Sequence, residues 1–283
     1  MKRAAIINDL SGIGRCSLNV AIAILATLEV QTCPLPTAVL SAQTGFEGFS
    51  FLDFTPHMKE YYTHWEKLNH EFDAIYSGFL GSKEQVEILL DLVPRFKKAH
   101  TLVLIDPVMG DNGKLYPVYE NTYPEDMKRL VALADVITPN ITELKLLMGI
   151  DLNQQMTRED LRLYTTDQIK SQKLKALGPK KIIITGLIEE DVMYNIGIDV
   201  EKNEWYEVKV AYNHRSYSGT GDIFASILCG CLTRGADLKA SIKLATEFIS
   251  KAIAYTEQQP NWDTRDGIMY EAFLKELRIN ETI

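Results

Sequence analysis

Short apolar segments alternate along this chain with longer segments of helical period, and this alternation limits the fold more than any other feature. The segments that predict strands are residues 4–8, 38–40, 74–77, 102–106, 136–138 and 182–185, with 193–198 and 205–210 as a hairpin pair. Apolar residues at helical spacing predict helices at 18–28, 57–69, 84–98, 125–134, 142–148, 167–177, 222–233, 239–256 and 268–277. Such alternation builds βαβ units, so we predict an α/β fold with a central, mainly parallel sheet and helices on both faces.

The domain organisation follows from the absence of any break in this pattern. The chain of 283 residues contains no internal repeat, no low-complexity tract and no linker rich in Pro, Gly or Ser. We therefore predict one domain over residues 1–283, a length that a single large α/β domain can hold. Ligands bind at the carboxyl ends of parallel strands, where this sequence repeatedly places polar groups. These groups are Asn8-Asp9, Ser77-Gly78, Asp106-Pro107, Thr138-Pro139-Asn140 and Thr185-Gly186.

The segment Gly219-Thr220-Gly221-Asp222 enters the helix predicted at 222–233 and carries the clearest chemical signal. A helix start directs free N–H groups and the positive end of the helix dipole outward, and glycine lets a phosphate approach the backbone closely. Asp222 would repel a phosphate, but it suits a base that takes the proton from a hydroxyl attacking phosphorus. An ordinary helix start, with Asp222 as a favourable first-turn acid, explains the same residues equally well.

Charge and composition exclude several classes of function. A formal net charge of −8 offers no basic surface to a nucleic acid, and no apolar stretch reaches the roughly 18 residues of a membrane span. The basic start reaches Asn8-Asp9 too early for a signal peptide, so we interpret it as the first strand. The four cysteines lack the spacing of a zinc site, and we expect buried thiols in a reducing, cytoplasmic compartment.

Two well-known nucleotide-binding motifs are incomplete or absent. The segment Gly12-Ile13-Gly14-Arg15-Cys16-Ser17 follows the first predicted strand but lacks the third glycine of the dinucleotide fingerprint, and no acid ends the second predicted strand. The P-loop pattern Gly-x-x-x-x-Gly-Lys does not occur. A short glycine loop beside a substrate is the better interpretation of residues 12–17.

Two further groups of polar residues lie in the middle of the chain. Asp106 ends a predicted strand and precedes a tight turn, and Asn140 and Glu143 lie three residues apart at a predicted helix start. A capping box explains Asn140 and Glu143 fully. Alternatively, Asp106 and Glu143 lie near a magnesium ion and bind it through water, because magnesium gives up its water reluctantly. Together with an anion site at a neighbouring sheet end, the second interpretation indicates phosphoryl transfer.

These segments in combination resemble a known superfamily. Gly219-Thr220-Gly221-Asp222 before an apolar helix resembles the signature of ribokinase-like kinases. Asp106-Pro107-Val108-Met109-Gly110-Asp111 and Thr138-Pro139-Asn140-x-x-Glu143-Leu144 resemble the vitamin-kinase branch. Within that branch, the segments 37–45 and 77–82 are most similar to those of pyridoxal kinases, also called pyridoxine or pyridoxamine kinases. The resemblance runs in the same order from the first strand to about Cys231.

The resemblance implies a ribokinase-like fold and ATP-dependent phosphorylation of the 5′-hydroxymethyl group of pyridoxal, pyridoxine or pyridoxamine. It implies that Asp222 is the base and that the N–H groups of Gly219, Thr220 and Gly221 hold the charge of the transferring group. It places Mg²⁺ at Asp106 and Glu143, and it implies a homodimer and, in many members, K⁺. The residues that it assigns to ATP are Asp106, Thr138, Asn140, Glu143, Thr185, Val208 and Val210. Those that it assigns to the vitamer are Asp9, Thr44 and Asp222.

The start of the chain departs from the pyridoxal kinase pattern. Those kinases commonly have Ser-His after the first strand, where this chain has Asp9-Leu10. Residues 8–12 instead resemble the Ser-Asp-Pro-Ser-Gly of hydroxymethylpyrimidine kinases of thiamine synthesis. That activity is therefore the first alternative, and a non-catalytic B6-binding protein is the second. A sugar kinase is disfavoured, because the early segment is too short for an inserted β-stranded lid.

Overall fold

The structure is a computed structural model and describes residues 1–278. Its strands are β1 (Lys2–Ser11), β2 (Val30–Leu40), β3 (Phe51–Asp53), β4 (Ala74–Ser77), β5 (Leu102–Ile105), β6 (Gly110–Asp111), β7 (Lys114–Leu115), β8 (Val136–Ile137), β9 (Lys181–Glu189), β10 (Val192–Asp199) and β11 (Glu204–Ala211). In this part of the chain, nine strands form one sheet in the order β11-β10-β9-β8-β5-β4-β1-β2-β3, and β6 and β7 form a separate hairpin. The strands from β9 to β2 pair in parallel, whereas β3, β10 and β11 pair antiparallel.

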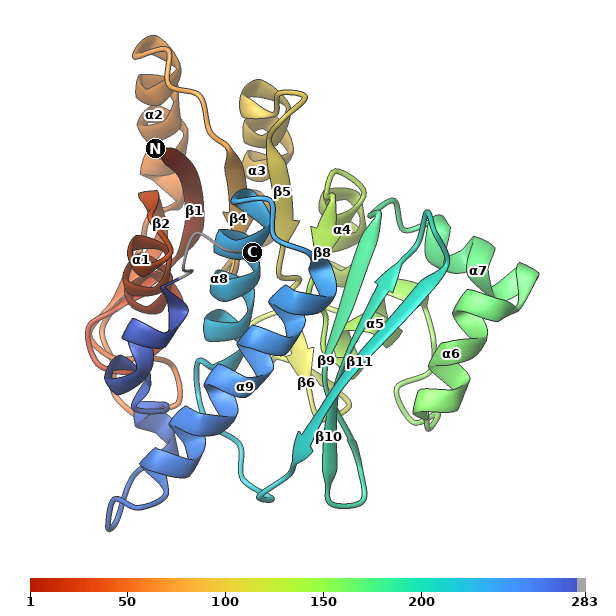
Figure 1. Ribbon diagram of the computed structural model, residues 1–283. Coiled ribbons are helices and arrows are strands. Elements are labelled where there is room, and N and C mark those ends of the chain that lie inside the picture. The colour runs from red at the N-terminus through yellow and green to blue at the C-terminus, as the bar shows by residue number, and fades with distance from the viewer. Residues whose placement is uncertain (279–283) are drawn as a thin grey trace.

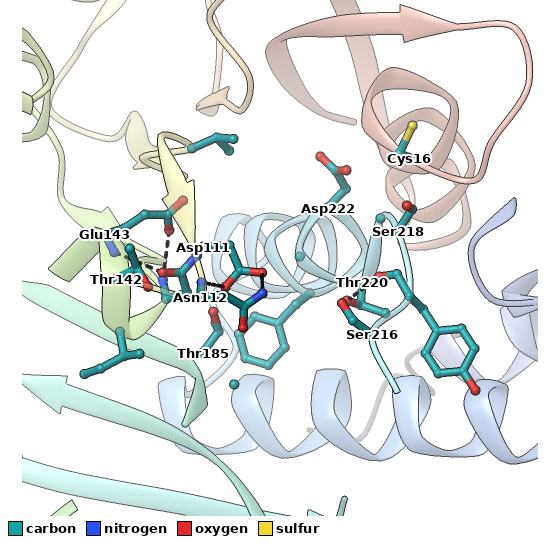
Figure 2. Close-up of a pocket in the computed structure, with 18 of the residues that line it drawn as sticks. Cys16, Asp111, Asn112, Thr142, Glu143, Thr185, Ser216, Ser218, Thr220 and Asp222 are labelled. Carbon is teal, nitrogen blue, oxygen red and sulfur yellow. Dashed lines mark hydrogen bonds between the residues drawn. The ribbon is translucent and has the colours of Figure 1, made fainter. Parts of the chain in front are cut away.

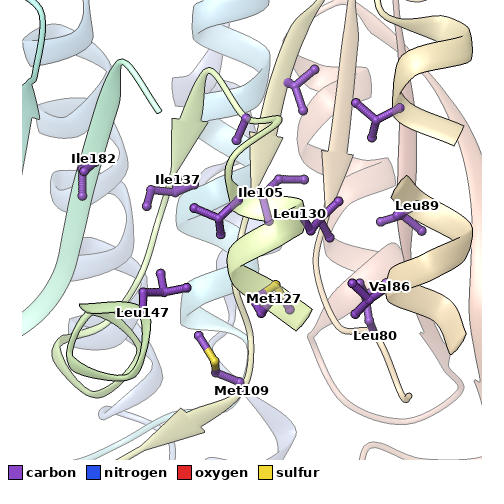
Figure 3. Packing of buried hydrophobic residues seen from close by; sticks show 14 of the residues in the cluster. Leu80, Val86, Leu89, Ile105, Met109, Met127, Leu130, Ile137, Leu147 and Ile182 are labelled. Atoms are coloured by element: carbon purple, nitrogen blue, oxygen red, sulfur yellow. The ribbon is translucent and has the colours of Figure 1, made fainter. Parts of the chain in front are cut away.

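Helices cover both faces of this sheet (Figure 1). They are α1 (Ser17–Thr27), α2 (Thr55–Lys67), α3 (Lys83–Phe96), α4 (Tyr123–Val131), α5 (Ile141–Met148), α6 (Arg158–Thr166), α7 (Gln168–Lys175), α8 (Thr220–Thr233) and α9 (Leu238–Thr256). The first apolar core joins α2, α3, α4 and α5 to one face, and Figure 3 shows part of it around Ile105, Met127 and Leu130. The second core joins α1, α8 and α9 to the other face. The predicted α/β architecture is confirmed.

The sequence patterns locate most elements to within a few residues, because the inner strands are apolar on both sides. Residues 74–77, for example, are all buried and form β4 as predicted. Residues 193–198 and 205–210 belong to β10 and β11, which form the expected antiparallel pair.

Two expectations about the elements need correction, and several elements have no counterpart in the prediction. Strand β2 begins at Val30 rather than at residue 38, despite Pro34 and Pro36. Since β3 pairs only with residues 38–40, the segment with the prolines is an edge, where a missing N–H costs no ladder bond. The predicted helix at 268–277 is instead a 3₁₀ segment, η2 (Tyr270–Leu277), and α6 has no counterpart in the prediction.

Candidate active site

The carboxyl ends of the parallel strands open onto a cavity of about 1940 Å³. Of the five polar groups expected at this edge, four contribute lining residues: Asp9, Asp106, Thr138 with Asn140, and Thr185 with Gly186. Ser77 and Gly78 do not line the cavity, although Phe79 beyond them does. In Figure 2, Thr142 and Glu143 project from one side and Thr220 and Asp222 from the start of α8 on the other.

The loop before α8 ends in an open helix N-terminus. Gly219 is the N-cap, has a left-handed backbone with φ of 77°, and provides no capping side chain. The first helical bond runs from the Ile223 N–H to the Gly219 carbonyl, so the preceding N–H groups have no acceptor within the helix. A Cβ added to Gly221 would meet no heavy atom within 4 Å, and Gly221 lines the cavity. This arrangement leaves room for an anion against the backbone.

Asp222 lies in the first turn of α8 at the cavity wall. Its Oδ1 accepts a hydrogen bond from Nδ2 of Asn8 at 3.0 Å. Removal from bulk water is the largest effect on this carboxyl and raises its pKa to about 6. The neighbouring charge of Asp9 also raises the pKa, whereas the Ser17 backbone and the Asn8 side chain lower it. A carboxylate with this pKa can accept a proton near neutral pH.

Asp9 lies at a β-bulge in the pairing of β1 with β2, where the register shifts between Asn8 and Leu10. Such bulges re-aim side chains next to active sites. Asp9 lines the cavity but is only 7% exposed. Its two carboxylate oxygens accept hydrogen bonds from Ser17 Oγ at 2.5 Å and from Ser11 Oγ at 2.8 Å. Burial raises the Asp9 pKa, and both hydroxyls oppose this by stabilising the carboxylate.

Asp106 follows β5 and lines the floor of the cavity. Its Oδ1 accepts a hydrogen bond from Thr138 Oγ1 at 3.0 Å. Burial raises the Asp106 pKa to about 7, and the charge of Asp222 adds to this shift. Asp106 and Asp222 both line the cavity, and like charges around one cavity disfavour the charged form of Asp106.

Glu143 forms the predicted capping box with Asn140. The Asn140 side chain accepts from the Glu143 N–H, and Glu143 Oε2 accepts from the Asn140 N–H, both at 2.9 Å. Glu143 Oε1 accepts from the Met109 N–H at 3.1 Å, which ties α5 to the segment before β6. Burial and the charge of Asp106 raise the Glu143 pKa well above its ordinary value. Glu143 can therefore cap α5 and also contribute to a site at the cavity.

The remaining predicted site residues divide between cavity and core. Thr44, Thr185 and Val210 line the cavity, as do Thr138 and Asn140. Val208 does not; it packs against the core beneath α8 and α9. The structure therefore does not bring Val208 to the surface that the resemblance assigned to ATP.

The sequence analysis gave no individual role to three polar residues at or near the site. Ser11 and Ser17 surround Asp9, and Asn8 contacts Asp222. Their position at and after the end of the first predicted strand was the available signal, but it could not say which residue each would contact. Among the residues that the structure describes, no group of three His, Cys, Asp or Glu side chains could hold a metal ion by itself.

Two properties expected from composition can be compared with the structure. Cys16, Cys229 and Cys231 are buried and Cys33 is half-buried, and all four are free thiols. Cys16 and Ser17 line the cavity, at the end of the loop that the sequence analysis placed beside a substrate. Within residues 1–278, none of the helices has the length and apolar character needed to cross a membrane.

A mainly parallel sheet with an open helix start and a carboxylate in its first turn defines the class: a ribokinase-like kinase. The sequence comparison gives the family. Residues 18–265 match the phosphomethylpyrimidine kinase family, and the chain belongs to it. The predicted superfamily is therefore confirmed.

Individual relatives support this assignment. A candidate phosphomethylpyrimidine kinase from Bacteroides thetaiotaomicron, solved with pyridoxal, is 38% identical with a TM-score of 0.91; the match covers 100% of this chain and 97% of that one. Pyridoxal kinase from Lactobacillus plantarum is 28% identical, with a TM-score of 0.87 over 98% and 96% of the two chains. The pyridoxine kinase of Bacillus subtilis is 33% identical over 64% of each chain.

The predicted resemblance to pyridoxal kinases is confirmed by these relatives. The aligned part spans 67% of a pyridoxal kinase from Pasteurella multocida but only 34% of a bifunctional thiamine-synthesis enzyme from Arabidopsis thaliana. The chain thus matches about two thirds or less of the length of these curated proteins.

Proposed function

We propose that this protein transfers the γ-phosphoryl group of ATP to the 5′-hydroxymethyl group of a vitamin B6 compound: pyridoxal, pyridoxine or pyridoxamine. The observation that carries the proposal is the position of Asp222. It lies at the cavity wall in the first turn of α8, next to N–H groups without helical acceptors and a glycine that faces open space. A base beside an anion site suits the transfer of a phosphoryl group to a hydroxyl.

In this proposal, the chain contributes mainly positioning and electrostatics. Asp222 accepts the proton of the attacking hydroxyl. The backbone N–H groups of Gly219, Thr220 and Gly221 stabilise the charge on the transferring group. Thr44 and Asp9 contact the vitamer, while Asn140, Thr185 and Val210 lie along the nucleotide.

The donor set at the cavity floor fits a magnesium ion bound partly through water. Asp106 Oδ1 accepts one hydrogen bond from Thr138, which leaves its other oxygen available. Both oxygens of Glu143 accept backbone N–H groups, so Glu143 would act through water rather than as a direct ligand. The raised pKa values of Asp106 and Glu143 also indicate acidic groups that a cation would stabilise in their charged form. When bound, Mg²⁺ would neutralise charge on the ATP phosphates.

The decisive experiment measures ADP release by the purified protein with Mg²⁺ and ATP. Each B6 vitamer and hydroxymethylpyrimidine is offered in parallel, and the Asp222→Asn variant serves as the control for contaminating kinases. Release with one or more B6 vitamers above the pyrimidine supports the proposal. A folded protein that binds ATP and a vitamer without releasing ADP contradicts it and favours a non-catalytic B6-binding protein.

Hydroxymethylpyrimidine is the second candidate substrate because of the residues around Asp9. The Ser11 and Ser17 hydroxyls donate to Asp9, so this wall presents oxygen acceptors to the cavity. A hydroxyl or amino substituent of either heterocycle could donate to them. Preferential turnover of the pyrimidine in the parallel assay would assign the protein to that reaction.

Further properties rest on the resemblance for the oligomer and K⁺, and on the sequence pattern and the cysteines for the domain and the location. We propose a homodimer, an activity increased by K⁺, a cytoplasmic location and one domain over residues 1–283. Sedimentation measurements and assays with K⁺ replaced by Na⁺ test the first two. Fractionation of the source cells and limited proteolysis test the others.

A further inference from the structure

The side chain of Asn8 connects three segments at the end of β1. Asn8 is 0% exposed. Its Oδ1 accepts from the backbone N–H groups of Phe79 at 2.9 Å and Asp9 at 3.0 Å. Its Nδ2 donates to Asp222 Oδ1 at 3.0 Å. The two backbone donors fix the orientation of the amide, because only its oxygen can accept them. The NH₂ group must therefore face the Asp222 carboxylate.

We propose that Asn8 is a positioning residue that holds the Asp222 carboxylate in its productive orientation. The bond from Asn8 holds Oδ1 of Asp222, so it fixes the direction in which the carboxylate meets the substrate hydroxyl whose proton it accepts. This inference rests on the proposed phosphoryl transfer with Asp222 as the base. A hydrogen bond that fixes a base contributes to the rate, because small errors of placement slow a reaction strongly.

A direct contact between Asn8 and the substrate is a different role, and the cavity argues against it. Asp9 and Asp222 both line the cavity, whereas Asn8 does not. Asn8 lies behind Asp222, at the place where the end of β1 meets the segment after β4. It can therefore influence the reaction only through the residues that it holds.

Gly78 fixes Asn8 from the other side. A Cβ added to Gly78 would lie 2.3 Å from Nδ2 of Asn8 and 2.7 Å from its Cγ. Any larger residue at position 78 must displace the amide. Gly78 is also outside the cavity lining, so this displacement offers a second, independent way to disturb the contact between Asn8 and Asp222.

No common substitute can replace this asparagine. Aspartate has the same shape, but it puts an acceptor against the Asp222 carboxylate and adds a like charge. Alanine removes the donor to Asp222 and also leaves the Phe79 N–H without its acceptor. We therefore expect Asn8→Ala and Asn8→Asp to lower kcat to different extents.

The first test compares steady-state kinetics of Asn8→Ala and Asn8→Asp with the wild type, using the best vitamer. Loss of a hydrogen bond to a charged group predicts a kcat lower by about 10- to 100-fold in Asn8→Ala, and lower still in Asn8→Asp. The KM for ATP should remain within about threefold of the wild type, since the anion loop is untouched. A kcat within twofold of the wild type in both variants would overturn the proposal.

A double-mutant cycle separates positioning from general damage. If Asn8 acts through Asp222, adding Asn8→Ala to Asp222→Asn should lower kcat by less than about twofold. If the double variant loses kcat by the full product of the two single reductions, Asn8 acts on a group other than Asp222. Gly78→Ala should reproduce the kcat loss of Asn8→Ala without changing a residue of the cavity.

The matched control is Gln85→Leu. Gln85 is another buried amide: its Oε1 accepts from the Gly81 N–H, and its Nε2 donates to the Thr37 carbonyl and to Thr55 Oγ1. It has no bond to Asp222. We expect Gln85→Leu to lower the midpoint of thermal unfolding but to keep kcat within threefold. A loss of kcat equal to that of Asn8→Ala would show that any damaged amide network slows the enzyme.

A readout without turnover separates this inference from the proposed function. The Asp222 carboxyl can be titrated by ¹³C NMR in the wild type and in Asn8→Ala. Removal of a donor to the charged form should raise the Asp222 pKa. An unchanged pKa overturns the positioning role even if no vitamer is phosphorylated, whereas a raised pKa in an inactive protein supports the contact and refutes only the activity.

Discussion

Gly219 packs directly against the carbonyl oxygen of Arg15: a Cβ added to Gly219 would lie 1.8 Å from that oxygen. The loop before α8 therefore rests on the loop before α1. This contact joins the candidate anion site to the segment that carries Asp9 and Ser17, and it explains why the two segments can cooperate although they are far apart in the chain.

We expect Gly219→Ala to damage folding and activity together. The added Cβ must displace backbone atoms, and φ of 77° is strained for alanine. A loss of about 2 kcal/mol or more in the free energy of unfolding is expected. Denaturant unfolding monitored by fluorescence checks this. Wild-type stability would mean that the loop moves freely away from Arg15.

Gly221→Ala should have the opposite effect on stability. Gly221 lies within α8, where alanine is favoured over glycine by about 0.5–1 kcal/mol, and no protein atom opposes its Cβ. The methyl group would instead occupy the space next to the N–H groups. We predict equal or higher thermal stability with weaker nucleotide binding and lower kcat, measured by calorimetry and by the ADP-release assay. Unchanged nucleotide binding and kcat would show that the phosphate does not bind next to Gly221.

Asp222→Asn should lower turnover by about 100-fold or more, the scale of general-base loss, while ATP still binds. In the wild type, kcat/KM should rise with pH through about 6. Burial raises the Asp222 pKa to about 6, and below this pH the protonated carboxyl cannot act as a base. Near-normal turnover of Asp222→Asn, or a rate independent of pH between 5 and 7, contradicts the assignment.

The stability of the protein without Mg²⁺ should fall as pH rises from about 4 to about 7. Burial raises the Asp106 pKa from 3.8 to about 7, so the folded state binds this proton more tightly than the unfolded state. The resulting stabilisation is complete below the unfolded pKa and is lost as pH passes the folded pKa.

Asp106→Asn should therefore stabilise the protein at pH 8 by roughly 1–3 kcal/mol but not at pH 4. The asparagine keeps an oxygen for Thr138. Urea unfolding at both pH values measures the difference, with the exposed Asp151→Asn as the control. If Asp106→Asn instead destabilises the protein at pH 8, the surroundings of Asp106 stabilise its charged form, which contradicts the raised pKa.

Ser17→Ala tests the wall around Asp9. Ser17 adopts a left-handed backbone with φ of 54°, which is uncommon for serine, and its hydroxyl donates to Asp9. Loss of this donor should raise the Asp9 pKa and the KM for the vitamer several-fold, while the KM for ATP stays constant. Equal changes in both KM values would show that Ser17 supports the cavity as a whole.

Local patterns were sufficient for much of the fold and part of the site. The two periodicities of apolar residues gave the order of strands and helices, because burial on a sheet or helix face imposes them directly. The capping box of Asn140 and Glu143 was also predictable, since its partners lie three residues apart. The full length of β2 was not predictable. Its prolines are acceptable only at a sheet edge, and the sequence does not tell which strand forms the edge.

The sequence by itself predicted the parallel architecture, the candidate anion loop of Gly219–Asp222 and the polar groups at the strand ends, all of which depend on neighbours in the chain. Only the tertiary structure decided which of these groups meet. Asn8 contacts Asp222 across 214 residues, and of two valines on the same face of β11, Val208 packs against the core while Val210 lines the cavity. Such contacts follow from how helices pack on the two faces of the sheet, which depends on the whole core rather than on any local pattern.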